Sequence, residues 1–517
     1  MADKYLNLQG SEKINETYDE INQGFDLVEV DIDAIEADYD NHVAGTNDKH
    51  DAEDINYSGD VAGATNVKQA LDNTDSRIDT IVTGDATSVA EVVDSRYSSV
   101  KDVSYSTLTD RLNANETDIK QLKDFLKLND VYGIYWDSSA NTVTRIGAAE
   151  DTVQADYDGI MPWAGMQRCN LSDAGVVNDY YGDPGYIEDG TNGQVMVEVP
   201  NFYYTSAEDS DGIYWAISMT FKNGFKPAVL LGDDMPEYFY VSAYEGCLYD
   251  TSATVYLAND EQVGDFTATT GDVLSSIAGV QPASGETQAL NIDNARIIAQ
   301  NRGTGWNLAA APAWFAIQLM MYVEYATFDI QTQIGDGIVG WDSGTSNHAQ
   351  DTGHTASLGN TSGEVEINPV ENGLTGSGNP YAMSYRGIEN FYGNIWTFID
   401  GINIKADNEL YINLTNEDLE SDVFTSPYQY VDTLPSANGY MASPVFNNVL
   451  DIGFICATTG ASNIFYSYYY QSTGNRIARF GGDWTNSAGH VGAACWALTL
   501  SSASGVRNSG ARLQFIK

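Results

Sequence analysis

The hydrophobic period of the chain changes near residue 131, and the change divides the sequence into two parts. Before it, apolar residues recur at alternating spacings of four and three, at Ile14, Tyr18, Ile21, Phe25, Val28, Ile32, Ile35 and Tyr39. This spacing predicts a coiled coil, because one helix cannot bury so narrow a stripe alone. The pattern leaves open an amphipathic helix packed on a globular neighbour.

Two shorter seams follow on polar connectors. The first is formed by Leu71, Thr74, Ile78 and Ile81, and the second by Leu108, Leu112, Asn115, Ile119, Leu122 and Leu126. Asn115 falls at a core position, where a buried polar residue specifies register and partner number. We therefore predict a self-associating stalk, with a first coiled coil in residues 1–40 and linkers with short coiled coils in 41–130. Homotrimers are the expected assembly, as in fibres.

From residue 131 onward, short aromatic runs alternate like strands and are separated by turn residues. Strands are predicted at 131–136, 142–146, 194–199, 202–204, 212–217 and 238–244. A helix is predicted at 311–328, apolar nearly all round and therefore buried, and another within 287–300. Residues 331–384 are rich in Gly, Ser and Thr and are predicted to form a long loop or insertion. Few helices among many strands indicate an α+β fold.

Charge and cysteine usage exclude several functions. The formal net charge of −49 argues against nucleic acid as a partner, because phosphate binding needs a basic surface. No run approaches about 18 apolar residues, so no membrane insertion is expected. The four cysteines, Cys169, Cys247, Cys456 and Cys495, are far apart and are predicted to be buried free thiols.

The C-terminal segment 479–517 combines a Gly-Gly-x-Trp turn (Gly481, Gly482, Trp484) with a final strand-like run at 510–515. The residues between are small, polar or aromatic, with few charges. Rigid aromatic side chains and adaptable Ser, Thr and Asn side chains are typical of recognition surfaces. The alternative is a solvated, loop-rich end of a β domain.

Three blocks resemble one family. They are the Gly-Gly-x-Trp turn with Gly510-Ala511-Arg512-Leu513, the segment 385–401 (YRGIENFYGNIWTFIDG), and Arg302-Gly303-Thr304-Gly305-Trp306 running into 316–326. Together they resemble the C-type-lectin-fold receptor-binding proteins of tailed phages. That group includes variable proteins diversified by retroelements, and it shares its fold with formylglycine-generating enzymes.

The resemblance implies a C-type-lectin-like receptor-binding domain over residues 131–517, carried on an N-terminal trimeric coiled-coil stalk. It implies a viral tail-fibre or tail-tip protein, located on the virion and extracellular. The segment 1–40 would attach to other tail or baseplate proteins, and the domain would bind a host-surface glycan or protein. The alternatives are a purely structural or decorating virion protein and, third, a surface-polysaccharide depolymerase.

The predicted receptor-binding residues come from two regions. Strand alternation places Tyr466, Tyr468 and Tyr470 on one side, either exposed or as a core-facing row. The resemblance adds residues of the terminal segment, some of them at positions where diversified relatives vary: Trp484, Asn486, His490, Trp496, Thr499, Arg507 and Asn508. Trp484 belongs to the fixed frame, so a core position is the alternative to contact for this residue. Ala493, Ala494 and Ala497 replace larger side chains at several such positions and imply a shallower surface.

No enzymatic activity and no cofactor are predicted, and the sequence leaves a metal open. The oxidases of this fold imply two nearby cysteines, whereas Cys495 stands alone and Cys456 lies about forty residues earlier. Arg386, Glu389, Asn390 and Asn394 have two interpretations, a ligand site or residues that hold loops together. The second is preferred, with Arg386 paired to Glu389 and Asn390 capping backbone groups.

Overall fold

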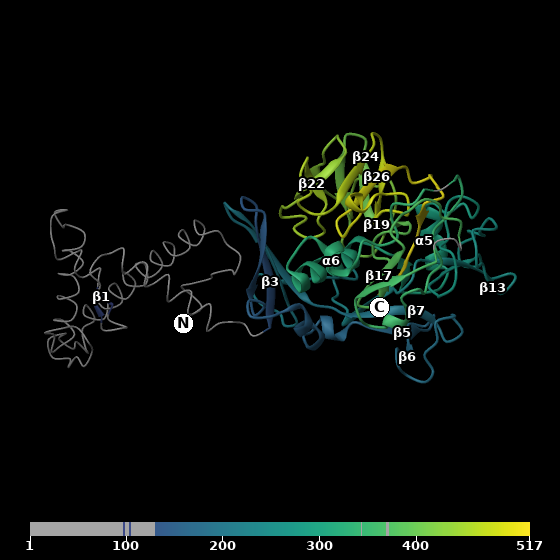
Figure 1. The fold of residues 1–517 in the computed structure, drawn as a ribbon, viewed down its shortest axis with the longest axis horizontal. Coiled ribbons are helices and arrows are strands. Elements are labelled where there is room, and N and C mark those ends of the chain that lie inside the picture. Colours follow the sequence, from purple (N-terminus) through teal and green to yellow (C-terminus); the bar gives the residue numbers. More distant parts are fainter. Residues whose placement is uncertain (1–96, 99–102, 105–129, 343, 369–371) are drawn as a thin grey trace, which may run out of the picture. The chain divides into compact units, whose positions relative to one another are not determined.

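The computed structural model describes residues 97–98, 103–104, 130–342, 344–368 and 372–517. The predicted coiled-coil seams at 14–39, 71–81 and 108–126 lie outside the described residues. The compact unit is Asp130–Lys517. It is mostly β-sheet with few helices, as Figure 1 shows.

The first strands of this unit form an antiparallel five-stranded sheet in the order β10-β8-β9-β3-β4. Its members are β3 (Val131–Asp137), β4 (Thr142–Gly147), β8 (Tyr203–Glu208), β9 (Gly212–Ser218) and β10 (Lys226–Pro227). Asp137 pairs with Thr142, so the hairpin predicted around the polar turn is confirmed. Ile134, Trp136 and Trp215 turn inward from this sheet and are buried.

A six-stranded sheet takes in the end of the chain. Its order is β15-β28-β11-β7-β5-β6. Its members are β15 (Trp306–Leu308), β28 (Leu513–Phe515), β11 (Tyr238–Ser242), β7 (Gln194–Pro200), β5 (Gln167–Leu171) and β6 (Val177–Tyr180). Phe515 pairs with both Tyr240 and Trp306, so the predicted final strand is confirmed and lies inside the sheet. Figure 1 accordingly shows the C-terminus beside β5 and β7.

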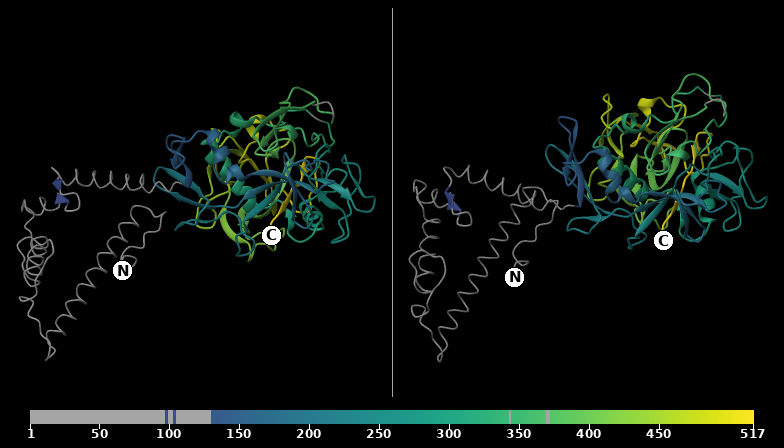
Figure 2. Two further views of the ribbon diagram at one scale, coloured as in Figure 1. Left: turned by 90° about the horizontal axis from the view of Figure 1, so that it is seen from below. Right: turned by 60° about the horizontal axis from the view of Figure 1, so that its bottom comes forward.

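The largest sheet has nine strands, eight of them in the order β21-β20-β19-β25-β26-β24-β22-β23, with β27 paired to β19. They are β19 (Trp396–Lys405), β20 (Glu409–Ile412), β21 (Gln429–Thr433), β22 (Gly439–Pro444), β23 (Cys456–Gly460), β24 (Tyr468–Gln471), β25 (Arg476–Phe480), β26 (Trp496–Leu500) and β27 (Ser509–Gly510). Figure 2 shows the last of these segments, coloured yellow, running through the body of the unit.

Two small sheets complete the β-structure of the compact unit. One contains β12 (Cys247–Asp250), β13 (Val255–Tyr256) and β14 (Val273–Ser275), and the other β16 (Gly363–Glu366), β17 (Tyr381–Tyr385) and β18 (Ile388–Glu389). The prediction of a long loop at 331–384 is therefore wrong in part. Helix α7 (Ile330–Ile334) and strands β16 and β17 lie in this region. The sequence of β16, rich in Gly and Glu, does not favour a strand, but pairing with β17 stabilises it as one.

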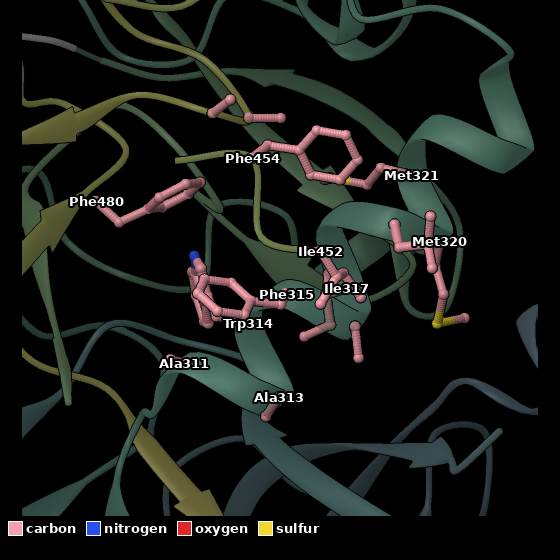
Figure 3. Close-up of a cluster of buried hydrophobic side chains, with 14 of the residues drawn as sticks. Ala311, Ala313, Trp314, Phe315, Ile317, Met320, Met321, Ile452, Phe454 and Phe480 are labelled. Atoms are coloured by element: carbon pink, nitrogen blue, oxygen red, sulfur yellow. The ribbon is translucent and has the colours of Figure 1, made fainter. Parts of the chain in front are cut away.

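Helix α6 (Ala311–Tyr325) lies at the centre of the core, and all but its last residue is buried, as predicted. It packs against β19, β3 and β9. The Trp314 ring stacks on Phe391 with 4.5 Å between centroids and 11° between planes. Figure 3 shows Trp314 and Phe315 of α6 together with Phe454 and Phe480. The second predicted helix is α5 (Ile292–Gln300), which is capped by the Asn291 side chain accepting from the Asn294 N–H.

The four cysteines are free and buried, as predicted. Burial raises the pKa of the Cys247 and Cys456 thiols to about 12, so both stay protonated at neutral pH. Among the described residues, no group of three or more His, Cys, Asp or Glu side chains is placed to hold a metal ion. None of the described helices is both long and apolar enough to cross a membrane.

Candidate functional site

Four ring-bearing residues from three separate segments meet at the surface of the nine-stranded sheet. Strand β24 pairs with β22, which sets Tyr468 opposite Tyr440. The short 3-10 helix η5 (Ala488–His490) brings His490 against them. Tyr440, Tyr468, Tyr470 and His490 are each partly buried, and we call them the aromatic patch.

The rings of the aromatic patch hold each other in place. The centroids of Tyr468 and His490 are 4.1 Å apart, and those of Tyr468 and Tyr470 are 4.7 Å apart. Tyr440 meets Tyr468 edge-on at 5.2 Å and 85°. Tilted and edge-to-face pairs of this kind are favoured by the ring quadrupoles. The patch is therefore a largely preformed surface, which costs little side-chain entropy when it binds a partner.

The electrostatics of the patch favour neutral rings. Burial raises the pKa of the Tyr470 phenol, with the Cys495 thiol and Asp483 as further causes. Burial lowers the pKa of the His490 imidazole, which favours its uncharged form at neutral pH. The patch thus offers aromatic faces and polar edges without a net charge.

Asn486 connects the aromatic patch to a second group of polar residues. Its amide N–H donates to the Tyr470 hydroxyl at 3.3 Å, and its amide oxygen accepts from the Asp483 N–H at 2.9 Å. Asp483 in turn accepts a hydrogen bond from the Asn508 amide. The turn at 483–486 and the segment before β27 are therefore tied together beside the patch.

The buried Arg479 side chain binds residues next to this polar group. It is 6% exposed, donates to Thr499 Oγ1 at 2.8 Å and to Ser509 Oγ at 2.6 Å, and lies 5.2 Å over the Trp396 ring. Burial lowers the pKa of its guanidinium to about 10, so it stays charged at neutral pH. Arg479 therefore orients Thr499 and the segment that carries Asn508.

Six of the ten predicted contact residues lie in or beside these groups: Tyr468, Tyr470, Asn486, His490, Thr499 and Asn508. Arg507 donates to the Ser346 carbonyl at 2.8 Å and lies 5.6 Å over the Trp484 ring. Tyr466 is 39% exposed and precedes β24, so it is not part of the predicted strand row. Tyr469, on the opposite side of β24, is buried.

The prediction of receptor contact is wrong for Trp484 and Trp496, because both side chains are completely buried. Trp496 meets Phe315 of α6 at 6.0 Å and Phe480 at 4.9 Å, so it belongs to the core. Trp484 lies beneath Arg507. Ala493, Ala494 and Ala497 are also buried, so they do not make a shallow surface. These residues fill the interior behind the turns.

Sequence reasoning missed Tyr440. Nothing near residue 440 distinguishes it from the other tyrosines of the chain, and its place depends on the pairing of β22 with β24. Alternation within one strand shows which side a residue faces, whereas the neighbour across the sheet depends on register.

The polar residues of the segment 385–401 hold loops of the interior together, which is the preferred interpretation, but their partners differ from those predicted. Arg386 pairs with Glu324 of α6, its Nε at 2.8 Å from Oε2 and its Nη2 at 2.8 Å from Oε1. The predicted Arg386–Glu389 pair is wrong. Glu389 instead accepts from the backbone N–H groups of Gly353 and Thr355.

The prediction that the Asn390 side chain caps backbone groups is wrong. Its amide N–H donates to the Glu245 carboxylate at 3.1 Å, and Asn394 donates to the same oxygen at 2.8 Å. Both asparagines have positive φ, 47° and 58°, a conformation that Asn tolerates better than most residues. The two residues bind a buried carboxylate that lies far away in sequence.

Among solved structures, the chain is similar to the Major Tropism Determinant U1 variant, with 13% identity over 75% of this chain and 72% of that one, at a TM-score of 0.24. It is also similar to the P3c variant, with 13% identity over 68% and 71%, at a TM-score of 0.23. No protein-family model matches the chain, and no curated protein matches it. At TM-scores this low, the likeness carries no conclusion about fold or function.

Proposed function

We propose that the chain is a tail-fibre or tail-tip protein of a tailed virus that binds a receptor on the host surface. In this proposal, residues 131–517 form a C-type-lectin-like receptor-binding domain. The three sequence blocks supply the resemblance. The observation that carries the proposal is the aromatic patch, which gathers Tyr440, Tyr468, Tyr470 and His490 at the surface beside Asn486.

The mechanism is adhesion without covalent chemistry. Partly buried tyrosines supply contact area and hydroxyl groups, and their edge-to-face packing restricts them before a partner arrives. Such rings stack equally well on the apolar face of a sugar or on a protein side chain. The partner is therefore a host-surface glycan or protein, and catalytic residues are not required.

Association of several chains would strengthen a weak single site. The proposed homotrimeric stalk would present three patches together, so that the second and third contacts form at high effective concentration. The N-terminal segment would attach to other tail or baseplate proteins. These parts of the proposal fall on residues outside those described.

The test is binding of the fluorescently labelled full chain to a panel of prokaryotic cells, measured by flow cytometry. We expect selective labelling of particular strains. Tyr468→Ala and His490→Ala each remove one half of the closest ring pair and should lower the apparent affinity by about tenfold or more, as for residues at the centre of an interface.

Tyr430→Ala is the matched control, because Tyr430 is 48% exposed and meets Tyr411 edge-on at 5.7 Å, outside the patch. It should leave labelling unchanged. Labelling of no strain would favour the decorating role, and labelling that survives both patch variants would refute the patch as the contact surface. Release of reducing sugar from isolated envelopes would indicate a depolymerase instead.

A further inference from the structure

A pocket lies on a different part of the compact unit from the aromatic patch. Turns around β5 and β6, the loop before β7, and the sheet of β12, β13 and β14 enclose a pocket of about 550 Å³. This volume lies within the usual range for small-molecule sites. None of the residues that line it belongs to the predicted receptor contacts.

One wall of the pocket is a pair of tyrosines. Tyr249 on β12 pairs with Tyr256 on β13, and their rings meet at 4.8 Å and 60°. The Tyr256 hydroxyl donates to the Gly190 carbonyl at 3.4 Å. A Cβ atom at position 190 would lie 2.3 Å from this hydroxyl oxygen, so only glycine allows the approach. Tyr249 is partly exposed, and its hydroxyl forms no hydrogen bond within the described residues. A flat ring with a free hydroxyl therefore faces the pocket.

Other residues that line the pocket carry amide and hydroxyl groups. Asn178 donates to the Asn192 carbonyl at 2.7 Å, and across the described residues its amide oxygen accepts no hydrogen bond. Thr191 donates to Asp189 at 2.6 Å, which leaves its hydroxyl oxygen able to accept. The Asn178 amide oxygen and the Thr191 hydroxyl oxygen therefore remain as hydrogen-bond acceptors in the lining of the pocket.

A buried arginine forms the floor. The Arg302 side chain is 4% exposed and is held by the Leu274 carbonyl at 2.5 Å, by Ser275 Oγ at 2.7 Å and by the Asp173 carboxylate. Of its five N–H groups, these contacts within the described residues use three and leave two. Asp173 neutralises its charge, so the lining carries one arginine and one carboxylate with no net charge.

We propose that this pocket binds a neutral carbohydrate. A pyranose stacks its apolar face on Tyr249 and presents its hydroxyls to Asn178, Thr191 and the remaining Arg302 N–H groups. An anionic ligand is disfavoured, because Asp173 already occupies the guanidinium and the protein carries a net charge of −49. The site goes beyond the proposed receptor function, since it lies apart from the aromatic patch.

The test is saturation-transfer NMR on the full chain with neutral sugars: D-glucose, D-galactose, D-mannose, L-rhamnose and N-acetyl-D-glucosamine, with their disaccharides. Concentrations up to about 20 mM cover the weak affinities expected of single sugars. We expect at least one sugar to give a saturable signal. Tyr249→Ala should weaken it by roughly tenfold, through loss of the stacking surface.

Asn178→Ala is a second variant at an exposed position, and it should weaken the same signal even if Tyr249→Ala does not fold. Tyr430→Ala and Tyr468→Ala should leave the signal unchanged, which separates this pocket from the aromatic patch. The proposal is overturned if no neutral sugar binds, if only an acidic sugar such as D-glucuronate binds, or if binding persists in both pocket variants. Loss of the signal in the Tyr430 or Tyr468 variant also overturns it.

Discussion

Buried carboxylates organise the loops around the middle sequence block. Glu324, Glu389 and Glu245 are at most 1% exposed, and each binds groups that lie far away in sequence. Glu324 receives two hydrogen bonds from Arg386 and one from Tyr385 at 2.9 Å. Removing the partner of such a buried carboxylate should lower the stability of the folded protein by about 3–5 kcal/mol. The conspicuous polar residues of the block are therefore structural.

Glu245 differs from the other two, because its charge is poorly compensated. Arg512 Nη2 is 3.9 Å from Oε1, and within the described residues Oε1 forms no hydrogen bond. Burial raises the pKa of the Glu245 carboxyl from 4.5 to about 7, although Arg512, Asn390 and Asn394 act in the opposite direction. The folded protein therefore holds this proton at pH values where the unfolded chain has lost it.

This difference predicts a pH-dependent contribution to stability. Below about pH 4.5 the carboxyl is protonated in both states, and its full contribution is present. As the pH rises from about 4.5 through about 7, the free energy of unfolding should fall by on the order of 3 kcal/mol relative to Glu245→Gln, which cannot ionise. Urea unfolding of both proteins at pH 5 and pH 8 measures the change. An equal difference at the two pH values would contradict it.

At the scale of elements, the terminal segment is divided between core and surface. Strands β25, β26 and β28 run through the interior, with Phe480, Trp496 and Phe515 buried. The turns between them carry Asn486, His490 and Asn508 to the surface. Packed strands hold the turns at fixed positions, so the segment acts as a scaffold with exposed loops rather than as one continuous contact surface.

The Gly-Gly turn that opens this segment has a steric requirement. Gly481 and Gly482 have φ of 95° and 92°, and a Cβ on Gly482 would lie 2.3 Å from Val491 Cγ1. Only glycine meets both conditions without strain. The turn thereby places Asp483 and Asn486 next to the aromatic patch.

Gly482→Ala should therefore cost about 3 kcal/mol or more, from the positive φ and the clash together. Gly182→Ala is the matched control, because Gly182 has φ of 98° and a Cβ there would meet nothing within 4 Å. It should cost only the conformational strain, about 1 kcal/mol. Chemical denaturation of both variants gives the comparison. Equal losses would show that the contact with Val491 is unimportant.

For the whole molecule, the described residues from 130 onward form a compact unit, Asp130–Lys517, and the heptad seams precede it in sequence. If a stalk associates three chains, each compact unit, or head, would keep its own core around α6. Function would then depend on the number of heads presented together, because avidity rises with linked copies even when no contact is added.

This arrangement predicts that the full chain is a trimer in solution, with a mass by light scattering three times that of one chain. Ile21→Asp combined with Ile119→Asp places charges in two seams and should give monomers, since buried unpaired charges are strongly unfavourable. Asp33→Asn, off the seam, should leave the trimer intact. A full chain that is monomeric at micromolar concentration would contradict the stalk.

Features that depend on local chemistry could be predicted from the sequence. These include the β3–β4 hairpin, the buried α6 helix, the final strand and the glycine turn at 481–482. Each follows from hydrophobic period, β-branched and aromatic runs, or backbone freedom over a few residues. Composition also indicated the terminal segment as a recognition surface, and strand alternation indicated Tyr468 and Tyr470 of β24 as candidate contacts.

Which residues contact each other could be learned from the folded structure alone. It placed Tyr440 beside Tyr468, gave Arg386 to Glu324 rather than to Glu389, and buried Trp484 and Trp496 beneath the turns. The physical reason is that period and composition show which side of an element is apolar, but not which distant element covers that side. Strand register and the packing of α6 make that choice, and they depend on contacts across the whole chain.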